Sequence, residues 1–190
     1  MTVLLFDVDG VLADTEHLHR QALKLAAARY GYKVPDTDAR TTRHKLLTAG
    51  VPPDQVEEVY RWKRLEYAQL VDQCVKLNPA LIAAIYTLYG KGHRLAACTN
   101  SNEKSTRHLL NNIGIYGAFS TIVASNHVEN GKPAPDIYLS AMSQLSALPS
   151  EAVVFEDSDI GVEAAVRAGV VNIIRCTTKT LLKELEPWLS

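Results

Sequence analysis

Two aspartates, two residues apart, end the first apolar run of the chain in the segment Asp7-Val8-Asp9-Gly10. Side chains two apart in a strand point to the same side, so the spacing predicts that both carboxylates face one site. Carboxylates at the end of a buried strand are costly unless a cation or hydrogen bonds hold them. Oxygen ligands select a hard cation such as Mg²⁺. The alternative interpretation is a turn, because Asp-Gly is a common turn pair.

A second set of polar side chains, Thr99-Asn100-Ser101-Asn102, follows a later apolar run, where a helix is expected to begin. The N–H groups at a helix N-terminus are available to an anion, and hydroxyl and amide groups beside them add further donors. The segment therefore suits an anion. Ordinary helix capping by the same residue types is the alternative.

Lys132 is a candidate cationic residue because of the loop that carries it. The segment Gly131-Lys132-Pro133-Ala134-Pro135 contains two prolines, which stiffen the backbone and restrict where the lysine points. An ammonium group held in this way can neutralise phosphoryl oxygens. Without such a partner, a lysine in a loop is an ordinary surface residue.

Three acids crowd the end of another apolar run, in Glu156-Asp157-Ser158-Asp159. One or two of these carboxylates could complete a Mg²⁺ shell, and the others would interact favourably with the dipole of the helix that follows. Capping of that helix by Ser158 or Asp159 is the alternative. Each of these four segments is weak evidence alone, but their order along one expected sheet edge points to a single site.

Five short, nearly continuous apolar runs are expected to be the strands that position these side chains. A continuous run is typical of a strand whose sheet is covered on both faces. Helical patterns separate most of the runs, which predicts an α/β fold with a doubly wound parallel sheet that binds ligands at the carboxyl ends of its strands. The runs span 3–9, 94–99, 121–125, 152–157 and 171–176, and the helical patterns span 79–89, 102–113, 135–145 and 159–168.

Residues 15–78 show no strand pattern and are expected to form helices inserted after the first strand. Such an insertion would lie over the carboxyl edge of the sheet as a lid. We therefore expect a catalytic core of residues 1–14 and 79–190 and a helical cap of residues 15–78. In this cap the first helix should end near Gly31 with Leu18, Ala22, Leu25 and Ala26 on one face, the second should run from about Asp36 to Gly50, and the third should begin at Pro53-Asp54.

Composition disfavours several classes of partner. The 190-residue chain is 47% hydrophobic and 22% charged, with a formal net charge of -1, which is typical of a globular protein and offers no basic field to a nucleic acid. No apolar run is long enough to cross a membrane and no charged leader precedes the first strand, so a cytoplasmic protein is expected. The three widely spaced cysteines predict neither a disulfide framework nor a zinc site. A monomer is expected because no exposed apolar stripe is evident.

Together and in order, these segments resemble the motifs of the haloacid dehalogenase superfamily, and in particular its beta-phosphoglucomutase-like phosphatase branch. The resemblance covers essentially the whole chain and implies a Rossmann-like sheet with a small helical cap inserted after the first strand. Residues 7–16 match the first motif, Thr99-Asn100 the second, Lys132 the third, and Glu156-Asp157-Ser158 with Gly161 the fourth.

The resemblance implies a phosphatase that works in two steps. Asp7 attacks phosphorus and becomes an aspartyl phosphate. Asp9 acts as the general acid towards the leaving alcohol and then as the general base for water. Thr99 donates a hydrogen bond, and Lys132 offsets charge on the phosphoryl oxygens. The expected substrate is a small phosphate monoester, such as a sugar phosphate or phosphoglycolate.

The resemblance also implies which residues bind the cofactor and the substrate. Mg²⁺ would be held by the Asp7 side chain, the Asp9 carbonyl and Asp157, with Glu156 close by. The residues expected to contact the substrate are Thr99, Asn100, Ser101 and Lys132 in the core and His19 and Arg43 in the cap.

A phosphosugar mutase is the main alternative activity. His19 matches a histidine of the beta-phosphoglucomutases, and Arg43 falls near an arginine that grips the distal phosphate of their substrate. Gln69 stands where those mutases carry a further substrate lysine, which favours the phosphatase. His19 could equally be a polar residue at the cap hinge, and Arg43 a solvated helix residue.

Three further classes fit the residues less well. Asp9 argues against a haloalkanoic acid dehalogenase, which needs neither an acid at this position nor Mg²⁺. Lys24, Lys33 and Lys45 do not match the imine-forming cap lysine of phosphonate hydrolases. A nonenzymatic binding homologue would usually have lost the nucleophile or a metal carboxylate, and this chain keeps every motif residue.

Overall fold

The computed structural model describes residues 2–35 and 42–189. The chain divides into two compact units, which we name the core unit (Met1–Asp14 with Lys76–Ser190) and the helical unit (Thr15–Val75). The helical unit is continuous in sequence and interrupts the core unit after Asp14. The chain therefore has a helical insertion after its first strand, as expected from the absence of a strand pattern there.

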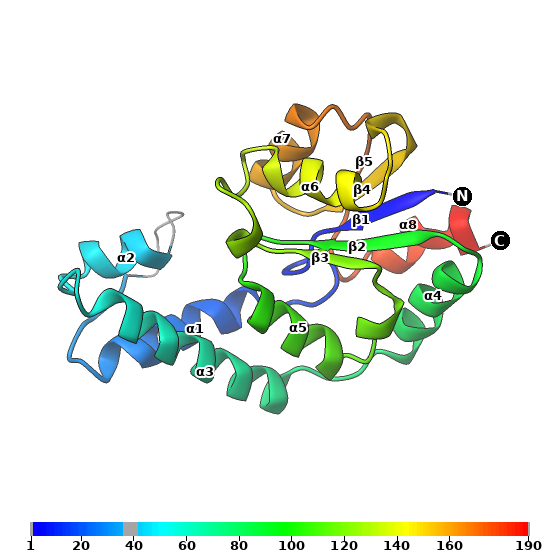
Figure 1. The fold of residues 1–190 in the computed structure, drawn as a ribbon. Helices are drawn as coiled ribbons and strands as arrows, with labels where there is room; N and C mark the ends of the chain where they lie inside the picture. Colours follow the sequence, from blue (N-terminus) through cyan, green and yellow to red (C-terminus); the bar gives the residue numbers. More distant parts are fainter. Residues whose placement is uncertain (1, 36–41, 190) are drawn as a thin grey trace. The chain divides into compact units, whose positions relative to one another are not determined.

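The core unit contains a parallel sheet. Its strands in the described residues are β1 (Val3–Phe6), β2 (Arg94–Cys98), β3 (Thr121–Val123), β4 (Ala152–Glu156) and β5 (Asn172–Arg175). They pair in the order β3-β2-β1-β4-β5, with β1 at the centre (Figure 1). All four residues of β1 are buried, as a continuous apolar run predicts for a strand covered on both faces. The expected doubly wound α/β fold is confirmed.

Each strand ends one to three residues before the end of the apolar run that predicted it. The chain leaves the sheet there to form the loops that carry the polar residues. After β1, for example, the N–H groups of Leu12 and Ala13 both donate to the Val8 carbonyl, at 3.0 and 3.1 Å. This tight turn brings the residues after Asp7 back towards the sheet edge instead of continuing the strand.

Helices cover both faces of the sheet (Figure 1). They are α4 (Pro79–Gly90), α5 (Glu103–Asn112), α6 (Asp136–Gln144), α7 (Asp159–Arg167) and α8 (Leu181–Leu189). Figure 1 shows α6 and α7 on one face and α4, α5 and α8 on the other. Helix α8, which contains Pro187, was not expected from the sequence. The proline removes a backbone donor and argues locally against a helix, although Leu181 and Leu185 are spaced as on one helix face.

Tertiary packing explains why α8 forms. Trp188 of α8 lies edge-on to Phe155 of β4, with ring centroids 5.6 Å apart. Phe155 in turn stacks on Phe6 of β1, with centroids 4.8 Å apart. The helix therefore completes the apolar layer on that face of the sheet, with Leu181 and Leu185 buried and Trp188 partly buried.

The described residues of the helical unit form α1 (Glu16–Ala28), α2 (Thr42–Thr48) and α3 (Val56–Cys74), and α1 packs along α3. Of the four residues expected on one face of α1, Leu18, Ala22 and Ala26 are buried, but Leu25 is 42% exposed, and Leu23 and Ala27 are buried as well. The buried stripe is therefore displaced around the helix from the predicted one. Asp36, where the second cap helix was expected to begin, lies outside the described residues.

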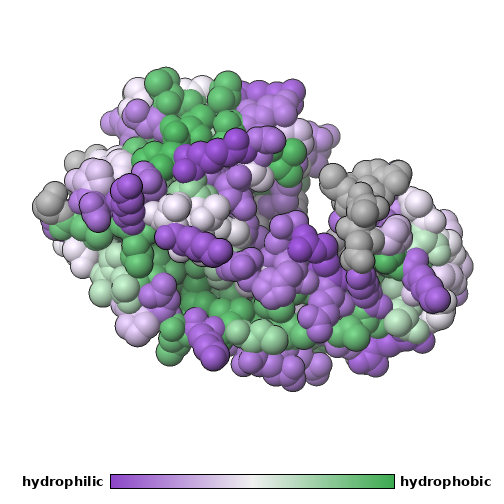
Figure 2. Space-filling model, turned by 180° about the vertical axis from the view of Figure 1, so that it is seen from behind, coloured by the Kyte–Doolittle hydropathy of each residue, from purple (hydrophilic) through white to green (hydrophobic). Residues whose placement is uncertain are grey.

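The surface exposes apolar as well as polar residues. Figure 2 shows this mixture on one face of the molecule. In the core unit, Leu148, Val166 and Val171 are 65%, 60% and 82% exposed. Within the described ranges, no helix combines the length and the apolar character needed to cross a membrane. The expectation of a monomer stays a prediction.

Candidate active site

The carboxyl ends of β1, β2 and β4 bring three of the four predicted segments together. Because β1 lies between β2 and β4, Asp7, Thr99 and Glu156 stand at the ends of adjacent strands. The N–H of Asp7 donates to the Phe155 carbonyl at 2.9 Å, so Asp7 is still attached to the sheet. The pair of aspartates and the acidic segment after β4 therefore share one edge, as expected for a doubly wound sheet.

Lys132 joins this edge from the loop before α6. Its Nζ donates to Asp7 Oδ1 at 2.6 Å, to the Cys98 carbonyl at 2.9 Å and to Glu156 Oε1 at 2.5 Å. Lys132 is only 7% exposed, so its ammonium is largely removed from bulk water. The loop thus places a positive charge between two buried carboxylates, where it offsets the cost of burying them.

Burial and pairing set the charges of these groups. Burial raises the pKa of Asp7 well above its usual value, and the charge of Lys132 opposes this rise. Burial alone would lower the pKa of Lys132, but the charges of Asp7, Tyr138 and Glu156 outweigh it and raise that pKa well above its usual value. Burial likewise acts to raise the pKa of Glu156, but the charge and hydrogen bond of Lys132 lower it overall. Lys132 and Glu156 therefore form the ionised pair, and Asp7 is the carboxyl group that a bound cation would most help to ionise.

Asp7, Glu156 and Asp157 form a group of carboxylates that could hold a metal ion, because one oxygen from each lies within 4.8 Å of the others. Gly10 has a φ of +101° and leaves room for Asp157, since a Cβ on Gly10 would lie 2.0 Å from Asp157 Oδ2. A donor set of carboxylate oxygens favours a hard cation. These residues fit Mg²⁺.

The side chain of Asp9 points to the loop after β2. Asp9 Oδ2 accepts from Ser101 Oγ at 2.8 Å and from Thr99 Oγ1 at 3.4 Å. Thr99 Oγ1 also accepts from the Ser101 N–H at 2.9 Å. The structure therefore groups Asp9 with two of the predicted phosphate-binding residues. The metal contact predicted for Asp9 involves its backbone carbonyl and remains a prediction.

Asn100 holds the loop that carries Lys132. Its Oδ1 accepts from the Lys132 N–H at 2.8 Å, and its Nδ2 donates to the Lys132 carbonyl at 3.0 Å. A Cβ on Gly131 would lie 2.6 Å from Asn100 Oδ1, so glycine allows this close approach. Asn100 was expected to contact the substrate, and no local pattern signals its pairing with a distant loop. The capping alternative applies to Asn102, whose side chain accepts from the Ser105 N–H at 3.1 Å.

Donors surround both oxygens of Glu156. Lys132 Nζ and the Tyr138 hydroxyl donate to Oε1, the hydroxyl at 2.7 Å. The N–H of Asp157, the N–H of Ser158 and the Ser158 hydroxyl donate to Oε2 at 3.1, 3.3 and 3.1 Å. Glu156 is therefore a buried acceptor that fixes Lys132. Tyr138 is a contributor that the sequence analysis missed, because its partner lies beyond the helix that carries it.

We expect replacement of Gly161 by alanine to lower kcat/KM on a phosphate ester about 100-fold. A Cβ at Gly161 would lie 1.9 Å from Glu156 Oε1, so the carboxylate must move and Lys132 loses a fixed acceptor. Steady-state kinetics together with thermal unfolding would measure the effect. The matched control is Gly90→Ala in α4, where a Cβ meets nothing within 4 Å and activity should be unchanged. A Gly161→Ala enzyme as active as the control would contradict this account of Glu156.

The two predicted cap residues lie in the helical unit and have separate partners there. His19 Nδ1 is 2.7 Å from Lys63 Nζ, and its ring stacks on Tyr67 with centroids 3.9 Å apart. Arg43 forms an exposed ion pair with Glu57 at 2.5 Å. The contacts expected between these residues and the substrate are not tested by this arrangement.

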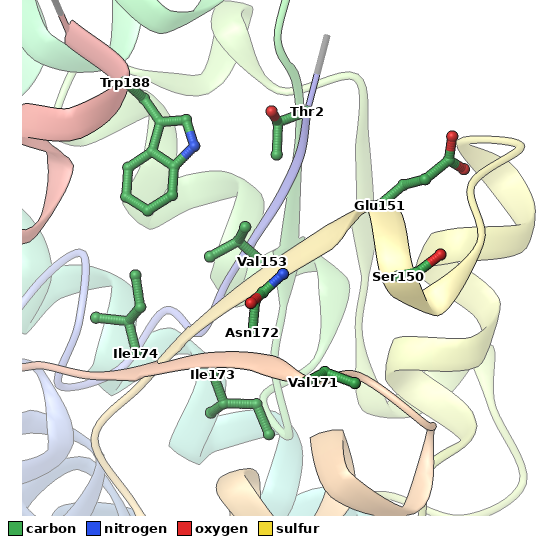
Figure 3. Close-up of a pocket in the computed structure, with 9 residues that line it drawn as sticks. All are labelled: Thr2, Ser150, Glu151, Val153, Val171, Asn172, Ile173, Ile174 and Trp188. Carbon is green, nitrogen blue, oxygen red and sulfur yellow. The ribbon is translucent and has the colours of Figure 1, made fainter.

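A different pocket, of about 590 Å³, opens at the other end of the sheet. Thr2, Glu151 and Asn172 line it at the amino ends of β1, β4 and β5, and Trp188 lines it from α8 (Figure 3). The residues along its wall include none of those predicted for the site. Since ligands of such sheets bind at the carboxyl ends of the strands, this pocket is not part of the candidate active site.

The chain is similar to known phosphatases over most of its length. A model of the family described as haloacid dehalogenase-like hydrolase matches residues 4–174. The phosphorylated carbohydrates phosphatase of Thermotoga maritima is 32% identical over 181 residues, which cover 91% of this chain and 84% of that protein. Fructose-1-phosphate phosphatase YqaB of Escherichia coli is 30% identical over 176 residues, which cover 88% of this chain and 92% of that protein.

Solved structures show a similar fold. CbbY from Rhodobacter sphaeroides in complex with phosphate has a TM-score of 0.76 and 29% identity, over 94% of this chain and 88% of that one. A mutant of CbbY from the same organism, in complex with xylulose-(1,5)bisphosphate, gives the same TM-score, identity and coverage.

Proposed function

The chain belongs to the haloacid dehalogenase-like hydrolases and is a phosphatase of phosphoric monoesters, and we propose that it hydrolyses a phosphorylated sugar with Mg²⁺ as its cofactor. The observation that carries this proposal is the position of Lys132 Nζ. It lies 2.6 Å from Asp7 Oδ1, beside the cluster of carboxylates formed by Asp7, Glu156 and Asp157. A nucleophile flanked by a lysine and a cation site suits transfer of a phosphoryl group. The similarity to phosphatases named for phosphorylated carbohydrates and for fructose 1-phosphate supports a sugar as the alcohol.

Asp7 and Asp9 divide the proposed chemistry between them. A carboxylate oxygen of Asp7 attacks phosphorus, the bond from phosphorus to the sugar oxygen breaks, and Asp9 donates a proton to that oxygen. A water molecule then attacks the phosphorus of the aspartyl phosphate. Asp9 takes a proton from this water, and the bond from Asp7 to phosphorus breaks to release inorganic phosphate. Hydrogen bonds from Ser101 and Thr99 orient the Asp9 carboxyl group, which is protonated before the first step and ionised before the second.

Charge compensation accounts for the remaining residues of the proposed site. Mg²⁺ would be held by the Asp7 side chain, the Asp9 carbonyl and Asp157, with Glu156 close by, and it would supply positive charge to the phosphoryl oxygens. Lys132 offsets charge on the same oxygens from the side of Asp7. Both contributions act by position, which is why the packing around Lys132 matters for the rate.

We expect a panel of metabolite phosphates to give Mg²⁺-dependent release of inorganic phosphate, with kcat/KM for hexose and pentose phosphates at least about tenfold above that for phosphoglycolate. Treatment with EDTA should abolish the release, and added Mg²⁺ should restore it. The cluster of carboxylates repels a phosphate unless a bound cation offsets its negative charge. No turnover of any phosphate ester in the presence of Mg²⁺ would contradict the proposal.

The same assays separate a phosphatase from a mutase. With beta-glucose 1-phosphate and a bisphosphate primer, a mutase would form glucose 6-phosphate without net release of phosphate. We expect net release, because Gln69 occupies the place of a substrate lysine in the mutases that the chain resembles. Interconversion of the two glucose phosphates at a rate above that of phosphate release would favour the mutase.

A further inference from the structure

Tyr138 of α6 contacts both members of the ionised pair. Its hydroxyl donates to Glu156 Oε1 at 2.7 Å, and Lys132 Nζ lies 4.9 Å from its ring centroid. Lys132 Nζ donates to the same oxygen of Glu156 at 2.5 Å. Tyr138 and Glu156 are both 0% exposed. Two donors from different parts of the chain therefore converge on one buried carboxylate oxygen.

We propose that Tyr138 is a positioning residue for phosphoryl transfer, acting on Lys132 through Glu156; the proposal rests on the phosphatase function above. The terminal torsion of a glutamate side chain is broad, so its carboxylate rotates unless it is held. The backbone and side chain of Ser158 hold Oε2, and the Tyr138 hydroxyl holds Oε1. With both oxygens held, Glu156 presents Lys132 with one fixed acceptor.

The position of Lys132 determines how much positive charge reaches Asp7. Nζ lies between Asp7 Oδ1 and Glu156 Oε1, at 2.6 and 2.5 Å, and the Cys98 carbonyl supports it at 2.9 Å. Rotation of Glu156 would draw the ammonium away from Asp7 and from a phosphoryl group attacked by Asp7. Stabilisation of a transition state falls steeply when a charged group is displaced by about 1 Å.

Packing alone does not explain the hydroxyl of Tyr138. The ring belongs to an apolar cluster with Cys98, Ala141, Val154 and Ala164, and a phenylalanine would fill the same space. The hydroxyl instead supplies a hydrogen bond to a buried, charged acceptor. Such an acceptor must shift or find another donor when one donor is removed. The hydroxyl therefore acts by holding the carboxylate of Glu156 and, through it, the ammonium of Lys132.

Replacement of Tyr138 by phenylalanine should lower kcat on the best sugar phosphate of the panel about tenfold while KM changes less than about twofold. Inhibition by orthovanadate should weaken about fivefold, because this oxyanion depends on the charge of Lys132. A purely structural role would lower the melting temperature but leave kcat and the inhibition by orthovanadate unchanged. The matched control is Tyr116→Phe, which removes a hydroxyl paired with Arg107 on an exposed part of the core unit, and its kinetics should match the wild type.

A double-substitution cycle tests whether Tyr138 acts through Glu156. In a Glu156→Gln background, Tyr138→Phe should lower kcat less than about twofold further. A full tenfold effect in that background, or a Tyr138→Phe enzyme with the kcat of the wild type, would overturn the inference.

Crystal structures of the wild type and Tyr138→Phe keep the test independent of turnover. Lys132 Nζ should move away from Asp7 Oδ1 in the variant, and an unmoved lysine would overturn the inference. A wild-type protein that hydrolyses no phosphate ester would instead count against the proposed function, and the two structures would still decide the role of Tyr138.

Discussion

Asp7→Asn is expected to lower kcat by at least about 10⁴-fold on any phosphate ester that the enzyme hydrolyses. The amide lacks an anionic oxygen, so it cannot attack phosphorus and no aspartyl phosphate forms. The substitution preserves the size of the side chain, and the contacts of Lys132 with Glu156 and Cys98 should persist. Steady-state release of phosphate, with a rapid-quench search for the phosphorylated protein, would measure the loss. Turnover within about tenfold of the wild type would exclude Asp7 as the nucleophile.

The same variant is expected to be more stable than the wild type at neutral pH when Mg²⁺ is absent. Burial raises the pKa of Asp7 well above its usual value of 3.8, so the folded state binds the proton more tightly than the unfolded chain. The wild type therefore loses stability as pH rises from about 3.8 through the folded-state pKa, and the uncharged amide of the variant removes this loss. Urea unfolding with EDTA at several pH values would measure the difference. The control Asp54→Asn, at an exposed residue of the helical unit, should change neither kcat nor the pH dependence.

Lys132→Met is expected to destabilise the fold by about 3–5 kcal/mol at neutral pH and to lower kcat about 10³-fold. The methionine fills much of the space of the lysine but leaves Glu156, which is 0% exposed, with its charge uncompensated. Urea unfolding and steady-state kinetics would measure the two losses. Lys104→Met, at an exposed position of α5, is the matched control and should preserve both stability and activity. A Lys132→Met protein as stable as this control would contradict the ionised pair.

The pH dependence of the stability of Lys132→Met shows which charge causes the destabilisation. In the wild type the pKa of Glu156 is lowered from 4.5, so its ionisation contributes stability above about pH 4.5 that is lost as pH falls through the folded-state pKa. Without the lysine, burial raises this pKa, and the deficit of the variant should grow as pH rises above about 4.5. Adding Glu156→Gln to Lys132→Met should recover part of the stability, because it removes the unpaired buried carboxylate.

Local patterns were sufficient for the sheet and most of its helices. The run 152–157 identified β4 because a strand buried on both faces must be apolar along its whole length. The run 171–176 identified β5, although this edge strand is exposed at Asn172 and Arg175. Helix boundaries also followed local signals, and α7 lies within one residue of its predicted span. Two features did not follow from local signals. Helix α8 depends on packing of Trp188 against Phe155, and the buried face of α1 excludes Leu25. Both depend on surfaces contributed by other elements.

Local patterns predicted which segments meet, because parallel strands bring their carboxyl ends to one edge and each predicted segment follows a strand or lies in a stiff loop. The expected parallel sheet alone therefore groups Asp7, Thr99 and Glu156 at one edge. The pairing of their side chains depends on the three-dimensional fold. Lys132 meets Asp7 from 125 residues away, and Tyr138 meets Glu156 from 18 residues away. Such contacts depend on side-chain torsions and on the packing of α6 against the sheet, and neither is encoded in a local pattern.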